Sequence, residues 1–78
     1  MTPTEIEQLI STGLPDCEVK VSSEDNTHFE AIVISAGFAG KRPLQRHQMV
    51  YRTLGDFMGN EIHALSIEAL TPDEQAAR

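Results

Sequence analysis

HFEAIVISAGFAGKRPLQRHQMVYRTLGDFM, residues 28–58, is the stretch that decides the fold of this 78-residue chain. Its first part, 28–35, is rich in β-branched residues and predicts a strand. The next part, 36–43, holds two glycines and a proline and predicts a loop or a short irregular turn. Apolar residues at helical spacing follow and predict a helix. A strand, a loop and a helix in this order predict a crossover to a parallel strand.

The predicted helix has two different faces. Its apolar face carries Leu44, His47, Val50, Tyr51, Leu54 and Met58. Its opposite face carries Arg42, Arg46, Met49 and Thr53. We therefore expect the first face to be buried and the arginines to be exposed. Gly59 and Asn60 predict the end of this helix, and a third strand is expected to begin near Ile62.

The segments on either side complete the fold. Thr2 and Glu5 have the spacing of a capping box and predict a first helix, which Gly13 and Pro15 end. Alternating residues over 17–21 predict a strand that pairs with 28–35 as a hairpin across a polar turn. The same capping spacing recurs at the C-terminus and predicts a short last helix, through the residues Thr71, Pro72 and Glu74.

The resulting order, α-β-β-α-β-α, predicts an α+β fold. A three-stranded mixed sheet would carry helices on one face and would leave its other face partly open. We expect residues 1–78 to form a single domain, because a chain of this length rarely divides its core.

Composition narrows the classes of function. Cys17 is the only cysteine, so no internal disulfide can form, and a reducing cytoplasm is the expected compartment. No apolar run is long enough to span a bilayer. The net charge of −6 argues against generic nucleic-acid binding, although residues 31–55 contain no acid and four of the six basic residues. No Ser-His-Asp, Cys-His or paired-carboxylate arrangement can be assembled, so we do not expect an enzyme.

Several short motifs, in order, resemble the BolA family. They are Phe38-x-Gly40-Lys41, Arg46-His47 with Val50-Tyr51, Ile62-His63-Ala64-Leu65, and Thr71-Pro72. The resemblance covers nearly the whole chain. The family's fold is similar to the class II KH domain, which agrees with the predicted order of elements.

The resemblance implies two kinds of function. Members of the family pair with monothiol glutaredoxins and share a [2Fe–2S] cluster in iron–sulfur trafficking or iron sensing. This implies a chain that is a monomer alone and a heterodimer with its partner, with glutathione also binding the cluster. Some bacterial members are described as transcriptional regulators that affect cell shape and stress responses.

Two histidines are the metal-ligand candidates that the resemblance implies. His63 corresponds to the family's histidine ligand, and His28 lies in the loop that supplies a second ligand, histidine or cysteine. An imidazole can replace thiolate on one iron of such a cluster. From the residues alone, a half-buried structural histidine at a strand start is the favoured reading of His63, and the resemblance reverses that order. His28 could equally be an exposed turn residue without a role. If both are ligands, they should lie at the same sheet end, each with an exposed nitrogen.

Residues 37–42 offer a different kind of site. Gly37 and Gly40 form G-x-x-G, the string by which KH domains clamp a nucleic-acid backbone. Lys41, Arg42 and Arg46 could bind its phosphates. The alternatives are a solvated basic face or one that binds an acidic protein. We interpret the two remaining chemically active residues as structural, namely His47 at the core edge and Cys17 as a small buried side chain.

Overall fold

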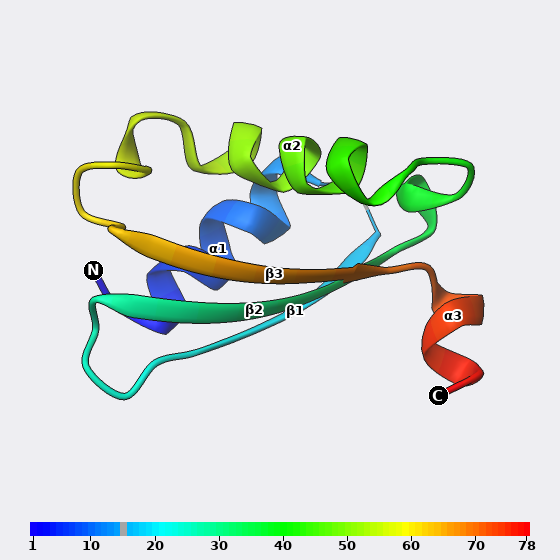
Figure 1. The fold of residues 1–78 in the computed structure, drawn as a ribbon, viewed down its shortest axis with the longest axis horizontal. Coiled ribbons are helices and arrows are strands. Elements are labelled where there is room, and N and C mark those ends of the chain that lie inside the picture. The colour runs from blue at the N-terminus through cyan, green and yellow to red at the C-terminus, as the bar shows by residue number, and fades with distance from the viewer. Residues whose placement is uncertain (15) are drawn as a thin grey trace.

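The computed structural model describes residues 1–14 and 16–78 (Figure 1). The predicted order of elements is confirmed, while Pro15, expected to help end the first helix, lies outside the described residues. The α-helices are α1 (Pro3–Gly13), α2 (Pro43–Leu54) and α3 (Pro72–Ala76). The strands are β1 (Cys17–Ser22), β2 (His28–Ser35) and β3 (Ala64–Leu70). Two short 3-10 helices, η1 (Ala36–Phe38) and η2 (Gly55–Phe57), flank α2.

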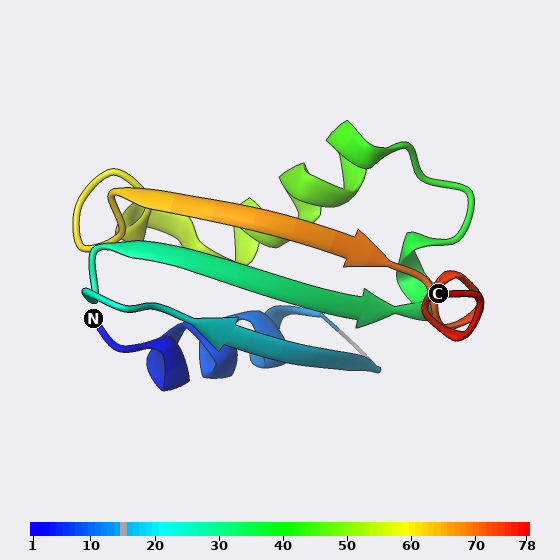
Figure 2. The same cartoon turned by 60° about the horizontal axis from the view of Figure 1, so that its bottom comes forward.

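The three strands form one mixed sheet in the order β1-β2-β3 (Figure 2). β1 and β2 are antiparallel, with Cys17 opposite Ser35. β2 and β3 are parallel, with His28 opposite Ala64. The hairpin and the parallel crossover that the sequence predicts are therefore both present.

One face of the sheet is covered and the other is open. Figure 1 shows α1 and α2 on one side of the strands, while α3 extends to the other side beyond the end of β3. The core between sheet and helices consists of Ile6, Ile10, Leu14, Val21, Phe29, Ala31, Val33, Phe38, Val50, Leu54, Ile62 and Leu65. On the open face Ile32 is 40% exposed. None of the described helices has the length and hydropathy needed to cross a membrane.

Both predicted capping boxes are present. The Thr2 side chain accepts a hydrogen bond from the Glu5 N–H, and the Thr2 N–H donates to Glu5 Oε1 at 2.9 Å. The same exchange joins Thr71 and Glu74, with the Thr71 N–H donating to Glu74 Oε1 at 2.8 Å. Each box satisfies backbone donors that the first turn of a helix leaves unpaired.

The second helix differs from its prediction in length. It ends at Leu54 rather than at Gly59 and Asn60, because Gly55 has φ +52° and the chain leaves the helical conformation there. The third strand accordingly begins at Ala64, two residues after the expected Ile62.

The second helix also differs in which face it buries. Val50 and Leu54 are buried as predicted, but Leu44 is 70% exposed and Tyr51 is 38% exposed. Met49 and Thr53, expected to face solvent, are half-buried. The reason is the position of α1, because a Cβ on Gly13 would lie only 2.6 Å from Thr53 Cγ2. This close approach of the two helices turns the Thr53 side of α2 inward.

Candidate functional site

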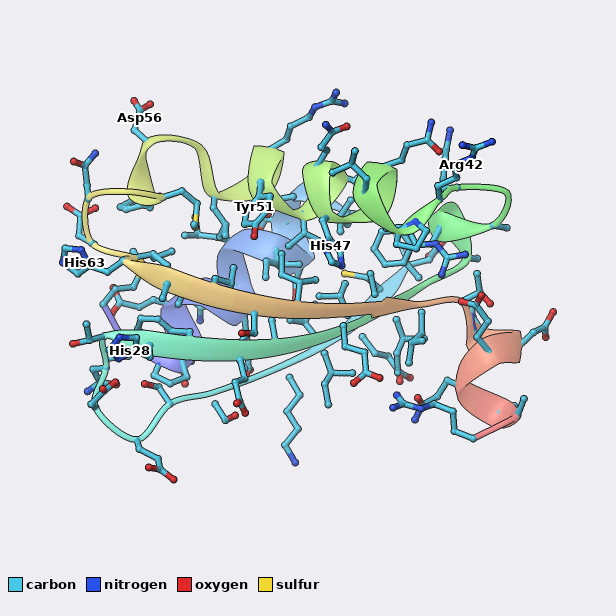
Figure 3. The ribbon with its side chains drawn as sticks, viewed as in Figure 1. His28, Arg42, His47, Tyr51, Asp56 and His63 are labelled. Atoms are coloured by element: carbon cyan, nitrogen blue, oxygen red, sulfur yellow. The ribbon has the colours of Figure 1, made fainter. Side chains whose placement is uncertain are left out.

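The two candidate ligands lie at the same end of the sheet. His28 is the first residue of β2 and pairs with Ala64, the first residue of β3. His63 directly precedes Ala64, and neighbouring strands are roughly 4.8 Å apart. Figure 3 shows both imidazoles at the end of the sheet where β2 and β3 begin. Both residues are exposed, so the predicted placement is confirmed.

The environment of His63 differs from the one expected. The alternative that the residues leave open is a half-buried histidine at the start of the third strand. Instead His63 is an exposed bend residue, and Ile62 is fully buried in its place. Within the described residues no hydrogen bond or ion pair holds the His63 ring. The alternative of a half-buried structural histidine is therefore wrong.

The His28 ring, in contrast, is held by Asp25. Its Nδ1 lies 2.9 Å from Asp25 Oδ2, although the His28 side chain is 73% exposed. The other carboxylate oxygen, Oδ1, accepts hydrogen bonds from the N–H groups of Thr27 and His28, both at 2.9 Å. These hydrogen bonds hold the pKa of Asp25 well below its ordinary value of 3.8. His28 thus presents its second nitrogen, Nε2, away from Asp25.

The turn before β2 is itself fixed by hydrogen bonds. Ser23 Oγ donates to the His28 carbonyl at 2.6 Å and accepts from the Asn26 N–H at 2.9 Å. Asn26 adopts φ +55°, a conformation that asparagine tolerates better than most residues. Asp25 was not among the residues predicted from the sequence. The signal that could have found it is an aspartate in a turn, because such a side chain commonly accepts hydrogen bonds from backbone N–H groups just after it.

A groove of about 500 Å³ lies beside His28. Its walls are formed by Ser22, Ser23, Glu24, Asp25, His28, Phe29, Glu30, Ala64 and Ser66. Among the described residues no three His, Cys, Asp or Glu side chains lie close enough to hold a metal ion together. A metal centre at this end would therefore need ligands from outside the chain as well as from His28 and His63.

The G-x-x-G segment lies at the other end of the sheet. It follows the C-terminus of β2, whereas His28 opens that strand. Phe38 is fully buried and anchors the segment, and Gly40 has φ +76°, which favours glycine. Lys41 and Arg42 are both exposed before α2.

Arg46 is not part of that exposed basic surface, contrary to the prediction. Only 12% of its side chain is exposed, and its Nη1 donates to Glu74 Oε1 at 2.6 Å. Nη1 also donates to the Ala69 carbonyl at 3.1 Å, and Nε donates to the Lys41 carbonyl at 2.9 Å. The guanidinium is thus paired within the chain, because Glu74 folds back onto it. The remaining basic candidates at this end are Lys41 and Arg42.

The two residues interpreted as structural have surroundings that suit such roles. His47 is half-buried on α2. Cys17 is half-buried rather than fully buried as expected. Its thiol lies 3.3 Å from the Leu14 carbonyl, to which it donates, and burial raises its pKa. Because Cys17 pairs with Ser35, it lies at the opposite end of the sheet from His28.

The histidine end of the molecule carries an excess of acidic residues. Glu24 and Asp25 in the hairpin turn, with Asp56 and Glu61 before β3, place carboxylates around it. Lys41 and Arg42 lie at the other end, together with the exposed acids Asp16 and Asp73. The histidine end therefore repels a polyanion, and the two candidate sites are separated by the length of the sheet.

Comparison with known proteins gives concordant matches. A family model described as BolA-like protein matches residues 13–74. "BolA-like protein 1" of Homo sapiens is 48% identical over 46 residues, which are 59% of this chain and 34% of that protein. "DNA-binding transcriptional regulator BolA" of Vibrio cholerae is 48% identical over 48 residues, 62% of this chain and 45% of that protein. The matched segment thus spans less than half of these relatives.

A solved structure agrees over almost the full length. The structure of a bolA protein homologue from Coxiella burnetii has a TM-score of 0.89 to this chain and 43% sequence identity. The match covers 97% of each chain. The fold, including its mixed sheet, is therefore that of this group of proteins.

Proposed function

The chain belongs to the BolA-like protein family, and we therefore propose that it is a non-enzymatic adaptor that binds a monothiol glutaredoxin and shares a [2Fe–2S] cluster with it. His63 and His28 would bind one iron. A cysteine of the glutaredoxin and the thiolate of glutathione would bind the other. The adaptor would be cytoplasmic, monomeric alone and heterodimeric with its partner.

The placement of His28 and His63 is the observation that carries this proposal. Both are exposed at the same sheet end, and the Asp25 contact leaves Nε2 of His28 accessible. Imidazole nitrogen is a suitable donor, since two histidines replace cysteines on one iron in some [2Fe–2S] centres. The cluster, when bound, supplies one-electron chemistry and transferable iron and sulfide. The chain's own part is to orient two imidazoles toward a partner that brings the remaining ligands.

Reconstitution tests the proposal. The two apo proteins are mixed with iron, sulfide and glutathione, and visible absorption and circular dichroism are compared with those of the glutaredoxin homodimer. A heterodimer with a different spectrum is expected. His63→Ala and His28→Ala should each alter that spectrum, whereas His47→Gln on α2 should leave it unchanged. An unaltered spectrum for His63→Ala would remove His63 from the ligand set.

DNA binding at the opposite end is the second candidate function. The relative from Vibrio cholerae is named as a DNA-binding regulator, and Lys41 and Arg42 are exposed beside the G-x-x-G segment. Phosphate contacts by these two residues would make affinity fall as salt rises. The arrangement of Arg46 weakens this candidate, because Glu74 already binds its guanidinium.

Titration of labelled DNA at two salt concentrations tests this second function. Lys41→Glu combined with Arg42→Glu should abolish binding, while His63→Ala should not change it. The absence of binding by the unaltered chain at moderate salt would rule it out. Because the two surfaces lie at opposite ends, each pair of variants also serves as the control for the other function.

A further inference from the structure

We propose that Asp25 is a positioning residue that fixes the His28 ring with its proton on Nδ1 and so selects Nε2 as the metal-binding nitrogen. The metal part rests on the proposed function. The proton position, however, is a property of the chain by itself and can be measured without any metal.

The argument begins with the hydrogen bond between the two side chains. Nδ1 of His28 and Oδ2 of Asp25 are 2.9 Å apart. An ionised carboxylate can only accept hydrogen bonds, so a neutral imidazole in this contact must carry its proton on Nδ1. Nε2 then keeps its lone pair and points away from Asp25. A histidine that binds metal through one nitrogen commonly donates its other N–H to a carboxylate in this way.

The carboxylate is held by the backbone of the same turn. Asp25 Oδ1 accepts from the N–H groups of Thr27 and His28, each at 2.9 Å. Ser23 ties the turn further by donating to the His28 carbonyl at 2.6 Å. With Oδ1 held by the backbone, Oδ2 of Asp25 is fixed beside the His28 ring.

His63 has no equivalent support among the described residues. Among the described residues, only the imidazole of His28 is therefore held by a hydrogen bond before a partner arrives. This difference is consistent with a role for Asp25 in orienting the His28 ring.

Asp25→Asn separates the two roles of the carboxylate, which are to hold the turn through Oδ1 and to hold the His28 ring through Oδ2. The asparagine oxygen can still accept from the Thr27 and His28 N–H groups, so the turn should persist. Its amide nitrogen replaces Oδ2 and can only donate, which favours a His28 ring whose proton is on Nε2. Glu24→Gln is the matched control, because it removes one charge from the adjacent exposed residue, which makes no hydrogen bond or ion pair in the described part of the chain.

Ring-nitrogen chemical shifts of the ¹⁵N-labelled apo chain provide the first measurement, at a pH where the imidazole is neutral. The unaltered chain and Glu24→Gln should show a protonated Nδ1 and an unprotonated Nε2 in His28. Asp25→Asn should show the reverse, with amide spectra confirming that it is folded. An unaltered chain with its proton mainly on Nε2, or an Asp25→Asn spectrum identical to it, would overturn the proposal.

The reconstituted glutaredoxin complex provides the second measurement. Asp25→Asn should reproduce the spectral change caused by His28→Ala, and Glu24→Gln should not. If His28→Ala alters the spectrum but Asp25→Asn does not, Asp25 has no positioning role for the metal. If the unaltered chain forms no cluster at all, the proposed function fails, and the nitrogen shifts alone then decide whether Asp25 sets the proton position.

Discussion

The carboxylate of Glu74 on α3 binds the guanidinium of Arg46 on α2 through two contacts, Oε1 to Nη1 at 2.6 Å and Oε2 to Nη2 at 3.3 Å. The same guanidinium donates to the Ala69 carbonyl at the end of β3 and to the Lys41 carbonyl before α2. It also lies 5.9 Å from the centroid of the buried Phe38 ring. One side chain thus joins the C-terminal helix, the last strand and the G-x-x-G segment.

Arg46→Ala should lower the free energy of unfolding by about 2 kcal/mol, because hydrogen bonds that involve a charged group each contribute roughly 1.5–3 kcal/mol. Urea unfolding followed by far-UV circular dichroism measures the effect. Arg52→Ala is the control, since Arg52 is an exposed arginine on the same helix. It should change the free energy by no more than about 0.5 kcal/mol. Equal losses for the two variants would contradict a structural role for Arg46.

Glu74→Gln should reduce stability most at neutral pH. Hydrogen bonds from Arg46 and from the Thr71 N–H lower the pKa of Glu74 below its ordinary value of 4.5. A lowered pKa stabilises the folded state above that ordinary value, and the contribution is lost as pH falls through the lowered pKa. The difference in melting temperature between the unaltered chain and Glu74→Gln should therefore be full at pH 7 and shrink below pH 4.5. A difference that grows on acidification would reverse the assigned sign.

Gly13→Ala should destabilise the protein although alanine favours helices. A Cβ at Gly13 would lie 2.6 Å from Thr53 Cγ2 and 2.8 Å from Thr53 Cβ. Overpacking of this kind costs about 1–3 kcal/mol, whereas the gain in helix propensity is at most about 1 kcal/mol. Urea unfolding of Gly13→Ala, Thr53→Ala and the double variant measures the coupling. The double variant should recover part of the loss, because only the Cγ2 contact is removed.

Thr12→Ala supplies the control for that series. Thr12 is an exposed residue of α1, so alanine there tests helix propensity without the contact between Gly13 and Thr53. It should be neutral or slightly stabilising. If Gly13→Ala stabilises the protein by as much, the two helices do not approach as closely as the structure has them.

Cys17 should react slowly with iodoacetamide in the native protein. Burial raises the pKa of its thiol above the ordinary value of 9.0, so less thiolate is present at pH 8 than in the unfolded chain. Alkylation followed by mass spectrometry, with and without urea, compares the two rates. Cys17→Ala should also leave the spectrum of the reconstituted cluster unchanged, since this residue lies far along the sheet from His28. Equal rates in the two states would show that the thiol is not shielded.

Features that depend on neighbours in the sequence were predictable. The capping boxes of Thr2 with Glu5 and of Thr71 with Glu74 form within a single turn, so their spacing alone specifies them. The parallel pairing of β2 and β3 followed from the length of the crossover, and it places His28 and His63 at one end of the sheet. Asp25 is also local to His28, but the polar composition of the turn does not by itself indicate which side chain contacts the ring.

The tertiary structure alone decided the remaining features. Which side of α2 is buried depends on where α1 crosses it. Thr53 therefore faces inward and Leu44 faces solvent, the reverse of what apolar spacing predicts. Arg46 looked like one of four surface cations, but Glu74, distant in sequence, binds it. Periodicity describes one element at a time, and it carries no information about which charges or helices from elsewhere will meet that element. These contacts form only when the whole core packs, because a charged side chain can be buried only where packing also brings its partner beside it.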